Sequence, residues 1–120
     1  MNTIKESMES LASVDGFIGA CIVDSNSGMM LGSLGGGSFN LEAAAAGNTE
    51  VVRAKRKTMR ALGLNDAIED ILITLGKQYH LIRPLGIKDG LFLYLVLDRA
   101  KANLALGRLQ LGNTEKMLVL

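Results

Sequence analysis

The first residues of this chain to invite a chemical interpretation are the glycines of "MMLGSLGGGSFN", residues 29–40, which follow an apolar run and precede a helical pattern. Glycine-rich loops at the start of a helix can bind phosphate through their backbone N–H groups. The triphosphate-binding pattern G-x-x-x-x-G-K-[ST] is absent, since no lysine occurs between Lys5 and Lys55, and the dinucleotide-binding spacing G-x-G-x-x-G is absent as well. We therefore predict that this stretch is a connector between a strand and a helix.

The side chains most often used in catalysis and metal binding are sparse and scattered. Cys21 is the only cysteine and His80 the only histidine, and both lie in apolar strand patterns rather than in loops beside a cleft. A metal site at His80 would need further ligands close to it, and its sequence neighbours include no cysteine or histidine. Glu69 and Asp70 are adjacent in a predicted strand, so their carboxylates would point to opposite faces, which is unsuitable for a general acid and base pair. We predict no catalytic residue, no metal site and no cofactor.

Four basic residues share one face of a predicted helix. Arg53, Arg56, Lys57 and Arg60 have the spacing i, i+3, i+4 and i+7, and residues 51–65 include no acidic residue. Two interpretations remain open. Either this basic face binds an acidic patch on a protein partner, or it is solvated and its cations suit the negative end of the helix dipole. Nucleic acid is disfavoured, because the formal net charge is only +1 and no aromatic residues for base stacking flank the cluster.

These residues must be positioned by the elements that apolar periodicity predicts. In the first half of the chain we expect an opening helix at residues 4–14, a hairpin of strands at residues 17–24 and 29–34, and a long helix at residues 41–62. Asn40 is a good N-cap for the long helix, and Gly63 is expected to end it in the left-handed conformation. The long helix has small and apolar residues on more than one face, which predicts that protein covers two of its sides.

The second half is predicted to be a three-stranded meander followed by a helix. The predicted strands occupy residues 67–75, 78–85 and 91–97. The seven consecutive apolar residues of the last strand predict that it is central and buried on both faces. Asp98 is expected to cap a closing helix that runs to about residue 110 and has on one face Ala102, Leu106 and Leu109.

Length and composition favour one domain. The chain has 120 residues, of which 48% are hydrophobic and 21% charged, as is typical of a globular protein. We expect a single domain over residues 1–120, with a core at about residues 4–111 and a tail or helix extension at residues 112–120. The amino-terminal segment lacks the pattern of a signal peptide, and the longest apolar run has seven residues, too few to span a bilayer. A cytoplasmic protein without a membrane span is therefore expected.

The order of these elements and four sequence segments resemble the roadblock family, which is named for dynein light chains and includes bacterial stand-alone domains. The segments are "SLASVDGFIGACIVDSNSG" at residues 10–28, "RALG" at residues 60–63, "ILITLGKQYHLIRPLG" at residues 71–86 and "LFLYLVLD" at residues 91–98. The resemblance implies a roadblock/profilin-like α+β fold with the order α-β-β-α-β-β-β-α. In that fold a five-stranded antiparallel sheet has the long helix on one face and the two terminal helices on the other.

The resemblance also implies a homodimer, which forms by side-by-side pairing of the first meander strand and of the long helix. An exposed edge strand would otherwise be an aggregation hazard, so its pairing with a second copy is physically reasonable. The residues predicted at this interface are Ala44, Val51, Val52, Met59, Ile71, Ile73 and Leu75.

Members of the roadblock family are not enzymes, and they scaffold complexes and bind or regulate small Ras-like GTPases. The resemblance thus implies a non-enzymatic homodimeric adaptor or regulator, whose partners are a second copy and a small GTPase or another protein. An alternative from another functional class is a small-ligand sensory module of related sheet-and-helix architecture. An apolar pocket of about 300 Å3 or more between sheet and helix would favour that alternative.

Overall fold

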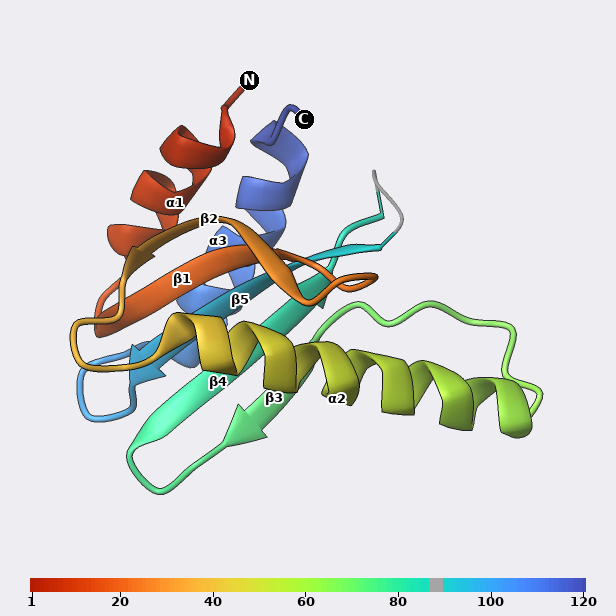
Figure 1. The fold of residues 1–120 in the computed structure, drawn as a ribbon. Helices are drawn as coiled ribbons and strands as arrows, with labels where there is room; N and C mark the ends of the chain where they lie inside the picture. Colours follow the sequence, from red (N-terminus) through yellow and green to blue (C-terminus); the bar gives the residue numbers. More distant parts are fainter. Residues whose placement is uncertain (87–89) are drawn as a thin grey trace.

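The computed structural model describes residues 1–86 and 90–120, which form one sheet with three helices (Figure 1). The elements follow each other in the predicted order α-β-β-α-β-β-β-α. They are α1 (Ile4–Ala12), β1 (Phe17–Asp24), β2 (Met29–Gly35), α2 (Leu41–Ala61), β3 (Ile71–Thr74), β4 (Gln78–Pro84), β5 (Leu91–Asp98) and α3 (Leu104–Met117). Within the described residues, no helix combines the length and the apolar character needed to cross a membrane.

The sheet is antiparallel throughout and has the strand order β2-β1-β5-β4-β3, which places β5 at its centre as predicted. Side chains of β5 alternate between the two faces, as the pleat of a strand requires. Phe92 and Tyr94 belong to a cluster that packs with α2, whereas Leu93 and Leu95 pack with α1 and α3. The long helix therefore covers one face and the terminal helices cover the other, which confirms the predicted fold (Figure 1).

The glycine-rich stretch serves as the connector that the sequence predicts. Gly35 ends β2 with a φ of +74°, a backbone conformation that disfavours side chains. A Cβ at this position would lie 2.7 Å from the carbonyl oxygen of Ile18 and 2.7 Å from the ring of Phe17. Glycine is required here because the chain leaves the hairpin sharply and passes close to β1.

Helix α2 has the predicted bounds to within one residue, because both of its ends carry local signals. The side chain of Asn40 accepts a hydrogen bond from the Ala43 N–H at 3.0 Å. At the other end, Gly63 has a φ of +68° and the Leu64 N–H donates to the Met59 carbonyl at 2.9 Å, as in a Schellman C-cap. The helix is 21 residues long and extends past the sheet (Figure 1).

The first meander strand is shorter than predicted. The sequence predicts a strand at residues 67–75, but β3 comprises only Ile71–Thr74, and residues 64–70 are extended without pairing to a strand. The register that pairs Ile71 with Ile82 would place Glu69 opposite Pro84, which ends β4 and has no N–H to donate. At the other end, the Leu75 N–H donates to the Gln78 carbonyl at 2.9 Å, so Leu75 belongs to the turn.

The closing helix begins later than predicted. Asp98 does not cap it, because the Asp98 carboxylate accepts from the Ala100 N–H at 2.9 Å within a separate turn. Asn103 is the N-cap instead, and its side chain accepts from the Leu106 N–H at 3.1 Å. The helix then continues through Met117.

The apolar face expected for the closing helix is not the face that the helix buries. Leu106 and Leu109 are 56% and 59% exposed, and the helix buries Gly107, Leu111 and Thr114 instead. A Cβ at Gly107 would lie 2.9 Å from Leu97 Cδ1, so glycine allows α3 to approach the sheet closely. The spacing of large apolar residues does not indicate this face, because a glycine and a threonine form much of it.

Candidate protein-interaction surface

The first part of the candidate surface is the free edge of β3. This strand lies at the edge of the sheet and pairs with β4 alone, through a register that sets Ile73 against His80. Leu72 is 37% exposed, and Ile73 is partly buried against the cluster that packs with α2. The outer N–H and C=O groups of β3 have no partner strand among the described residues, which leaves this edge able to pair with another strand.

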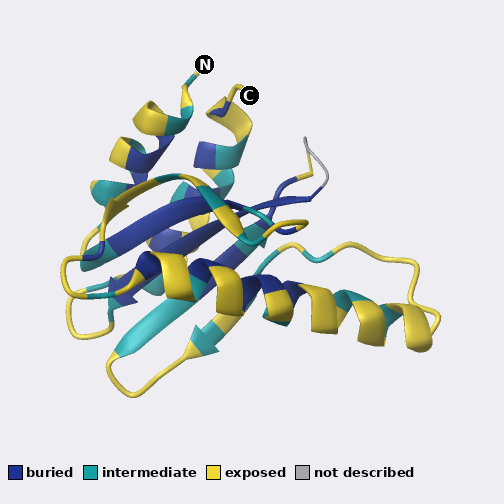
Figure 2. Ribbon diagram, in the orientation of Figure 1, coloured by how far each residue is buried: buried dark blue, intermediate teal, exposed yellow. Residues whose placement is uncertain are grey.

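The second part is formed by the later half of α2 and the extended segment after it. The buried residues of α2 are Leu41, Ala45, Asn48, Thr49 and Val52, so no residue after Val52 is buried. Residues 53–70, which we call the arm, project from the sheet and return to it at the start of β3 (Figures 1 and 2). Leu62 and Leu64 on the arm are 67% and 52% exposed.

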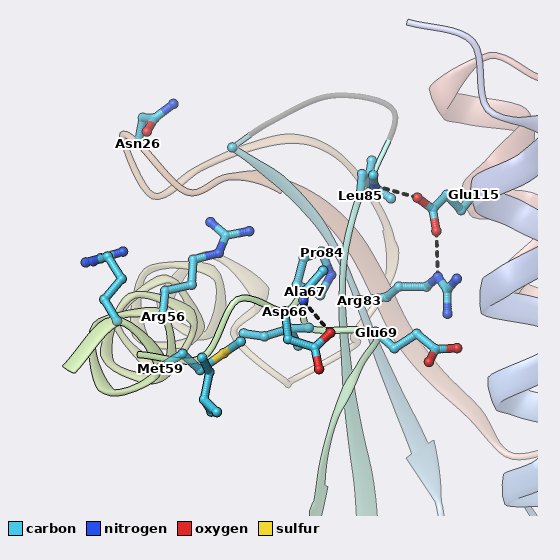
Figure 3. A pocket seen from close by; sticks show the side chains of 15 residues that line it. Asn26, Arg56, Met59, Asp66, Ala67, Glu69, Arg83, Pro84, Leu85 and Glu115 are labelled. Atoms are coloured by element: carbon cyan, nitrogen blue, oxygen red, sulfur yellow. Dashed lines mark hydrogen bonds and ion pairs between the residues drawn. The ribbon is translucent and has the colours of Figure 1, made fainter. Parts of the chain in front are cut away.

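A groove of about 1050 Å3 lies between the arm and the body of the domain (Figure 3). Arg56 and Arg60 line it from α2, and Asp66 and Glu69 line it from the extended segment. Its charged residues on the body side are Arg83, at the end of β4, and Glu115, on α3. The groove therefore has walls with charges of both signs, and Met59 contributes an apolar patch between them.

Two ion pairs fasten α3 to the base of the arm and to the end of β4. Arg108 donates to Asp70 through Nε at 3.0 Å and Nη2 at 3.1 Å. Arg83 Nε donates to Glu115 at 2.7 Å, and Glu115 also accepts from the Gly86 N–H at 2.7 Å (Figure 3). Sequence reasoning missed these contacts, because residues separated by more than 25 positions carry no local signal of their proximity.

The structure distributes the residues of the predicted dimer interface over different environments. Ala44, Val51, Ile71 and Ile73 are partly buried and pack against the cluster on the α2 side of the sheet. Met59 lines the groove, and Leu75 is 42% exposed in the turn after β3. Val52 is 0% exposed within the protomer, so its side chain belongs to the protomer core and its assignment to a surface contact was wrong.

The four residues of the predicted basic face of α2 also lie in different environments. Arg53 donates to the carbonyl of Asn26 at 2.8 Å and pairs with Glu50 at 3.3 Å, so it anchors α2 to the turn between β1 and β2. Arg56 and Arg60 line the groove. Lys57 is exposed and is not part of the groove lining. The four cations that the sequence places on one helix face therefore have three different environments.

A polar network lies on the α2 side of the sheet, away from the groove. Tyr94 Oη lies 2.9 Å from His80 Nδ1, and His80 Nε2 lies 2.8 Å from Gln78 Oε1. Burial raises the pKa of Tyr94 to about 12 and lowers the pKa of His80. With a neutral imidazole, the Tyr94 hydroxyl donates to Nδ1 and Nε2–H donates to Gln78, so every contact in the network has a donor and an acceptor.

The titratable groups with shifted pKa values do not converge on a cleft. Burial raises the pKa of the Cys21 thiol to about 12, which keeps the thiol protonated at neutral pH. The Thr3 N–H donates to the Glu6 carboxylate at 3.0 Å, and this contact together with the Thr3 side chain lowers the pKa of Glu6. Neither residue, nor His80 or Tyr94, lines the groove. Among residues 1–86 and 90–120 no group of histidine, cysteine, aspartate and glutamate is arranged to hold a metal ion.

The chain is similar to known proteins in its structure, whereas comparisons of its sequence find no match. No protein-family model matches the sequence, and no curated protein matches it significantly. The Roadblock/LC7 domain from Streptomyces avermitilis is similar with a TM-score of 0.82 and 14% identity, over 96% of this chain and 93% of that one. MglB of Myxococcus xanthus is similar with a TM-score of 0.82 and 18% identity, over 94% of this chain and 89% of that one.

MglC from Myxococcus xanthus is also similar, with a TM-score of 0.62 and 17% identity over 94% of this chain and 93% of that one. All of these structures share the arrangement of sheet and helices while differing from this chain at most sequence positions. The chain therefore has the roadblock/LC7 fold.

Proposed function

We propose that this protein is a non-enzymatic adaptor or regulator that acts as a homodimer and binds a small Ras-like GTPase. The observation that carries the proposal is the free edge of β3 next to an arm without buried residues, within a roadblock/LC7 fold. Both features leave backbone groups and apolar side chains of the protomer without cover. A second protomer that pairs its β3 with this edge would cover them and extend the sheet.

Self-association is further supported by the character of the exposed side chains. Leu72 and Leu75 at the β3 edge are 37% and 42% exposed, and the arm adds Leu62 and Leu64. Apolar residues that gather at an unpaired edge are typical of an interface rather than of a solvated surface. One similar structure is of MglB with a tetrameric arrangement, at a TM-score of 0.79 and 16% identity.

The GTPase enters the proposal through the sequence resemblance to the roadblock family. Similarity in fold to MglB, which in Thermus thermophilus is described as a gliding protein, is compatible with a regulatory role. The exposed basic part of α2 outside the groove, represented by Lys57, is our candidate for this contact. Acidic surface on the GTPase would complement it.

The test has two stages. Light scattering at low micromolar concentration should give a mass of about twice 12.8 kDa, and a monomer would contradict the homodimer. Purified Ras-like GTPases from the same genome, loaded with GDP or a non-hydrolysable GTP analogue, should then bind in a nucleotide-dependent way. Failure of all of them to bind would contradict the GTPase partner without affecting the homodimer.

The alternative of a small-ligand sensor has less support. The groove exceeds the roughly 300 Å3 at which small-molecule sites begin, but six charged side chains line it. It also lies under the projecting arm rather than between the sheet and the buried part of α2 (Figure 3). A site of this kind lacks the apolar enclosure that would favour small-ligand binding.

A further inference from the structure

We propose that the edge of the sheet opposite β3 also binds a second copy of this chain, through antiparallel pairing of two β2 strands about a two-fold axis at Ser33. This contact goes beyond the proposed homodimer and does not depend on it, because β2 and β3 lie at opposite edges of the sheet. It gives the protein a second, weaker interface that joins homodimers to one another.

Strand β2 is the second free edge of the sheet. It pairs with β1 alone, and among the described residues no strand lies on its outer side. Residues 25–41, which include all of β2, have no charged residue and no proline. Charged residues and proline are the usual means by which an edge strand avoids pairing with another chain. This edge therefore lacks that protection.

The exposed side chains of β2 are largely apolar. Met29, Leu31 and Leu34 are 66%, 48% and 37% exposed. Apolar side chains that gather on an unpaired edge are typical of a surface that another chain covers.

A β-bulge leaves part of this edge regular. Ile22 pairs with Gly32 whereas Val23 pairs with Met30, so Leu31 is the extra residue of the bulge. A bulge disrupts pairing only locally. Residues 32–35 pair with β1 without a further shift, and they equal β3 in length. This segment is therefore able to accept another strand.

The side chains of β2 on the α1 face complement those of a second copy. Gly32 and Leu34 pair with β1 residues of the cluster that packs with α1 and α3. An antiparallel pair about Ser33 sets Gly32 of each protomer opposite Leu34 of the other. Ile4 of α1 lies so close to Gly32 that a Cβ there would collide with it. Leu34 of the second copy would pack beside Ile4, where Gly32 contributes no side chain.

The position of α1 also fits a two-fold pair. Helix α1 packs on both β1 and β2, so it lies above the gap between these strands (Figure 1). Neighbouring strands are about 4.8 Å apart, so the two α1 helices would lie about 10 Å apart across the axis, a normal distance for packed helices. Pairing of the strands therefore brings the helices into contact without a clash.

The side of α1 that faces the second copy has charges of both signs. Ser10 accepts a hydrogen bond from Gln110 of α3 at 2.6 Å, so this side of α1 faces α3. Lys5 and Glu9 lie one turn apart on the other side, and both are exposed. Among the described residues, neither side chain forms an ion pair within 4.0 Å. Antiparallel packing of two α1 helices sets Lys5 of each near Glu9 of the other.

A second copy matches this edge better than a segment with charge of one sign. In a two-fold symmetric contact the same surface meets itself, and an uncharged strand does not repel its copy. Lys5 and Glu9 are complementary to themselves in the antiparallel arrangement. An acidic or a basic segment would meet one charge of the wrong sign.

The β2 contact should be weaker than the contact through β3. It offers a four-residue segment and one side of the nine-residue helix α1, whereas the β3 edge lies beside the projecting half of α2. We expect it to form above about 100 μM, so that at low micromolar concentration only the homodimer is present. Each homodimer has two β2 edges, so association at high concentration should continue beyond a pair of homodimers.

Sedimentation equilibrium over this concentration range tests the contact. The average mass of the wild type should rise above twice 12.8 kDa, whereas Leu34→Lys should raise the Kd of the second association by at least about tenfold. Leu109→Lys is the matched control, since Leu109 is 59% exposed on α3, and it should behave like the wild type. A wild-type mass that stays at twice 12.8 kDa throughout would overturn the inference.

Circular dichroism should show that the variants are folded. If Leu34→Lys does not fold, Ser33→Lys replaces it, because Ser33 is exposed and pairs with a residue of the opposite face of the sheet. Normal association of the folded β2 variant would also overturn the inference.

Replacement Ser33→Cys tests the position of the axis. The two introduced thiols would lie directly opposite each other, within the range of a disulfide. Cys21 is the only native cysteine, and burial raises the pKa of its thiol to about 12, so it should not compete. Mild oxidation should give a covalent dimer, and much less should form from Ser38→Cys, at an exposed position in the connector. Equal yields from both variants would contradict pairing about Ser33.

A charge exchange tests the contact between the α1 helices. Lys5→Glu alone should weaken the second association by roughly threefold, and the double variant Lys5→Glu with Glu9→Lys should restore it. Both changes suit the helix dipole, because an acid is added at the start of α1 and a base near its end. A double variant as weak as the single one would contradict the antiparallel packing of these helices.

Variants of the two edges separate this inference from the proposed homodimer. Ile73→Lys should remove the β3 contact and leave pairs formed through β2 at high concentration. Ile73→Lys combined with Leu34→Lys should be monomeric throughout. A wild type that is monomeric at low micromolar concentration but associates through β2 at high concentration would contradict the homodimer alone. A wild-type homodimer that associates no further would contradict this inference alone.

Discussion

Arg108 and Asp70 form a bidentate ion pair that joins α3 to the residue immediately before β3. The two contacts are 3.0 and 3.1 Å long, and the Asp70 side chain is only 13% exposed. β3 has four residues and pairs with one strand, so its own hydrogen bonds hold its start weakly. The ion pair thus orders the edge that we propose as the dimer interface.

Replacement Arg108→Met should loosen β3 while leaving the rest of the sheet unchanged. The Arg108 side chain is 52% exposed, so the loss in free energy of unfolding should be at most about 1 kcal/mol. Hydrogen exchange followed by mass spectrometry should show faster exchange in the peptide that contains β3. Lys101→Met on an exposed turn is the control and should not change that peptide.

Replacement Glu115→Gln should destabilise the protein more strongly. Glu115 is 13% exposed and accepts hydrogen bonds from Arg83 and from the Gly86 N–H, so the change leaves a mostly buried guanidinium without its counter-charge. We expect a loss of roughly 1–3 kcal/mol in the free energy of unfolding, measured by urea denaturation. A loss no larger than that of Arg108→Met would show that water replaces the hydrogen bond and the counter-charge that Glu115 supplies to Arg83.

Replacement Ile73→Lys should weaken self-association, because it places a charge where the two protomers are proposed to meet. We expect the dimer Kd to rise by more than about tenfold by analytical ultracentrifugation. Leu106→Lys is a matched control, since Leu106 is 56% exposed on α3 and lies on the opposite side of the sheet from α2. A folded Ile73→Lys protein that remains a dimer would exclude this strand from the interface.

Replacement Gly35→Ala should lower the melting temperature. Gly35 has a positive φ, and its Cβ would meet the carbonyl of Ile18, so a loss of more than about 1 kcal/mol is expected. Gly47→Ala is the opposite case, because Gly47 lies within α2 and its Cβ would meet nothing within 4 Å. That variant should gain roughly 0.5–1 kcal/mol in the free energy of unfolding, because alanine favours a helix.

Stability should fall in mild acid because of His80. Its pKa is lowered in the folded state by burial, so the unfolded chain binds a proton at higher pH than the folded protein does. The contribution of His80 to the free energy of unfolding is complete above the ordinary histidine pKa of about 6.5. It is lost as the pH falls through the lower pKa that His80 has in the folded protein. Urea denaturation between pH 7 and pH 5 should show this loss, and His80→Gln should reduce its slope.

Local signals explain why much of the fold was predictable from sequence. Strand β1 begins at Phe17 and ends at Asp24, as predicted, because turn-forming residues flank this short apolar run. The start and end of α2 follow from Asn40 and Gly63, whose capping roles depend only on nearby residues. The central place of β5 follows from its unbroken apolar run, since only a strand covered on both faces is so apolar.

Features that depend on tertiary contacts were not predictable in the same way. The start of β3 is set by Pro84 on the neighbouring strand, and the buried face of α3 is set by a glycine that fits against Leu97. The basic residues of α2 were visible in the sequence, but their division between the groove and the turn at Asn26 depends on where the helix leaves the sheet. The acidic residues of the groove had no signal of their own, because Glu69 was predicted within a strand and Asp66 in the link before it.

The pairing of β1 with β5 has a consequence for how the chain acquires its fold. The ladder joins Phe17 to Leu97 and Asp24 to Leu91, so the central contact of the sheet connects segments from opposite ends of the chain. During synthesis the hairpin of β1 and β2 must wait for β5 to emerge from the ribosome, with apolar side chains such as Val23 still without their final neighbours. Nascent chains that stop before residue 91 should therefore depend on chaperones, and folding should complete late and in one cooperative step.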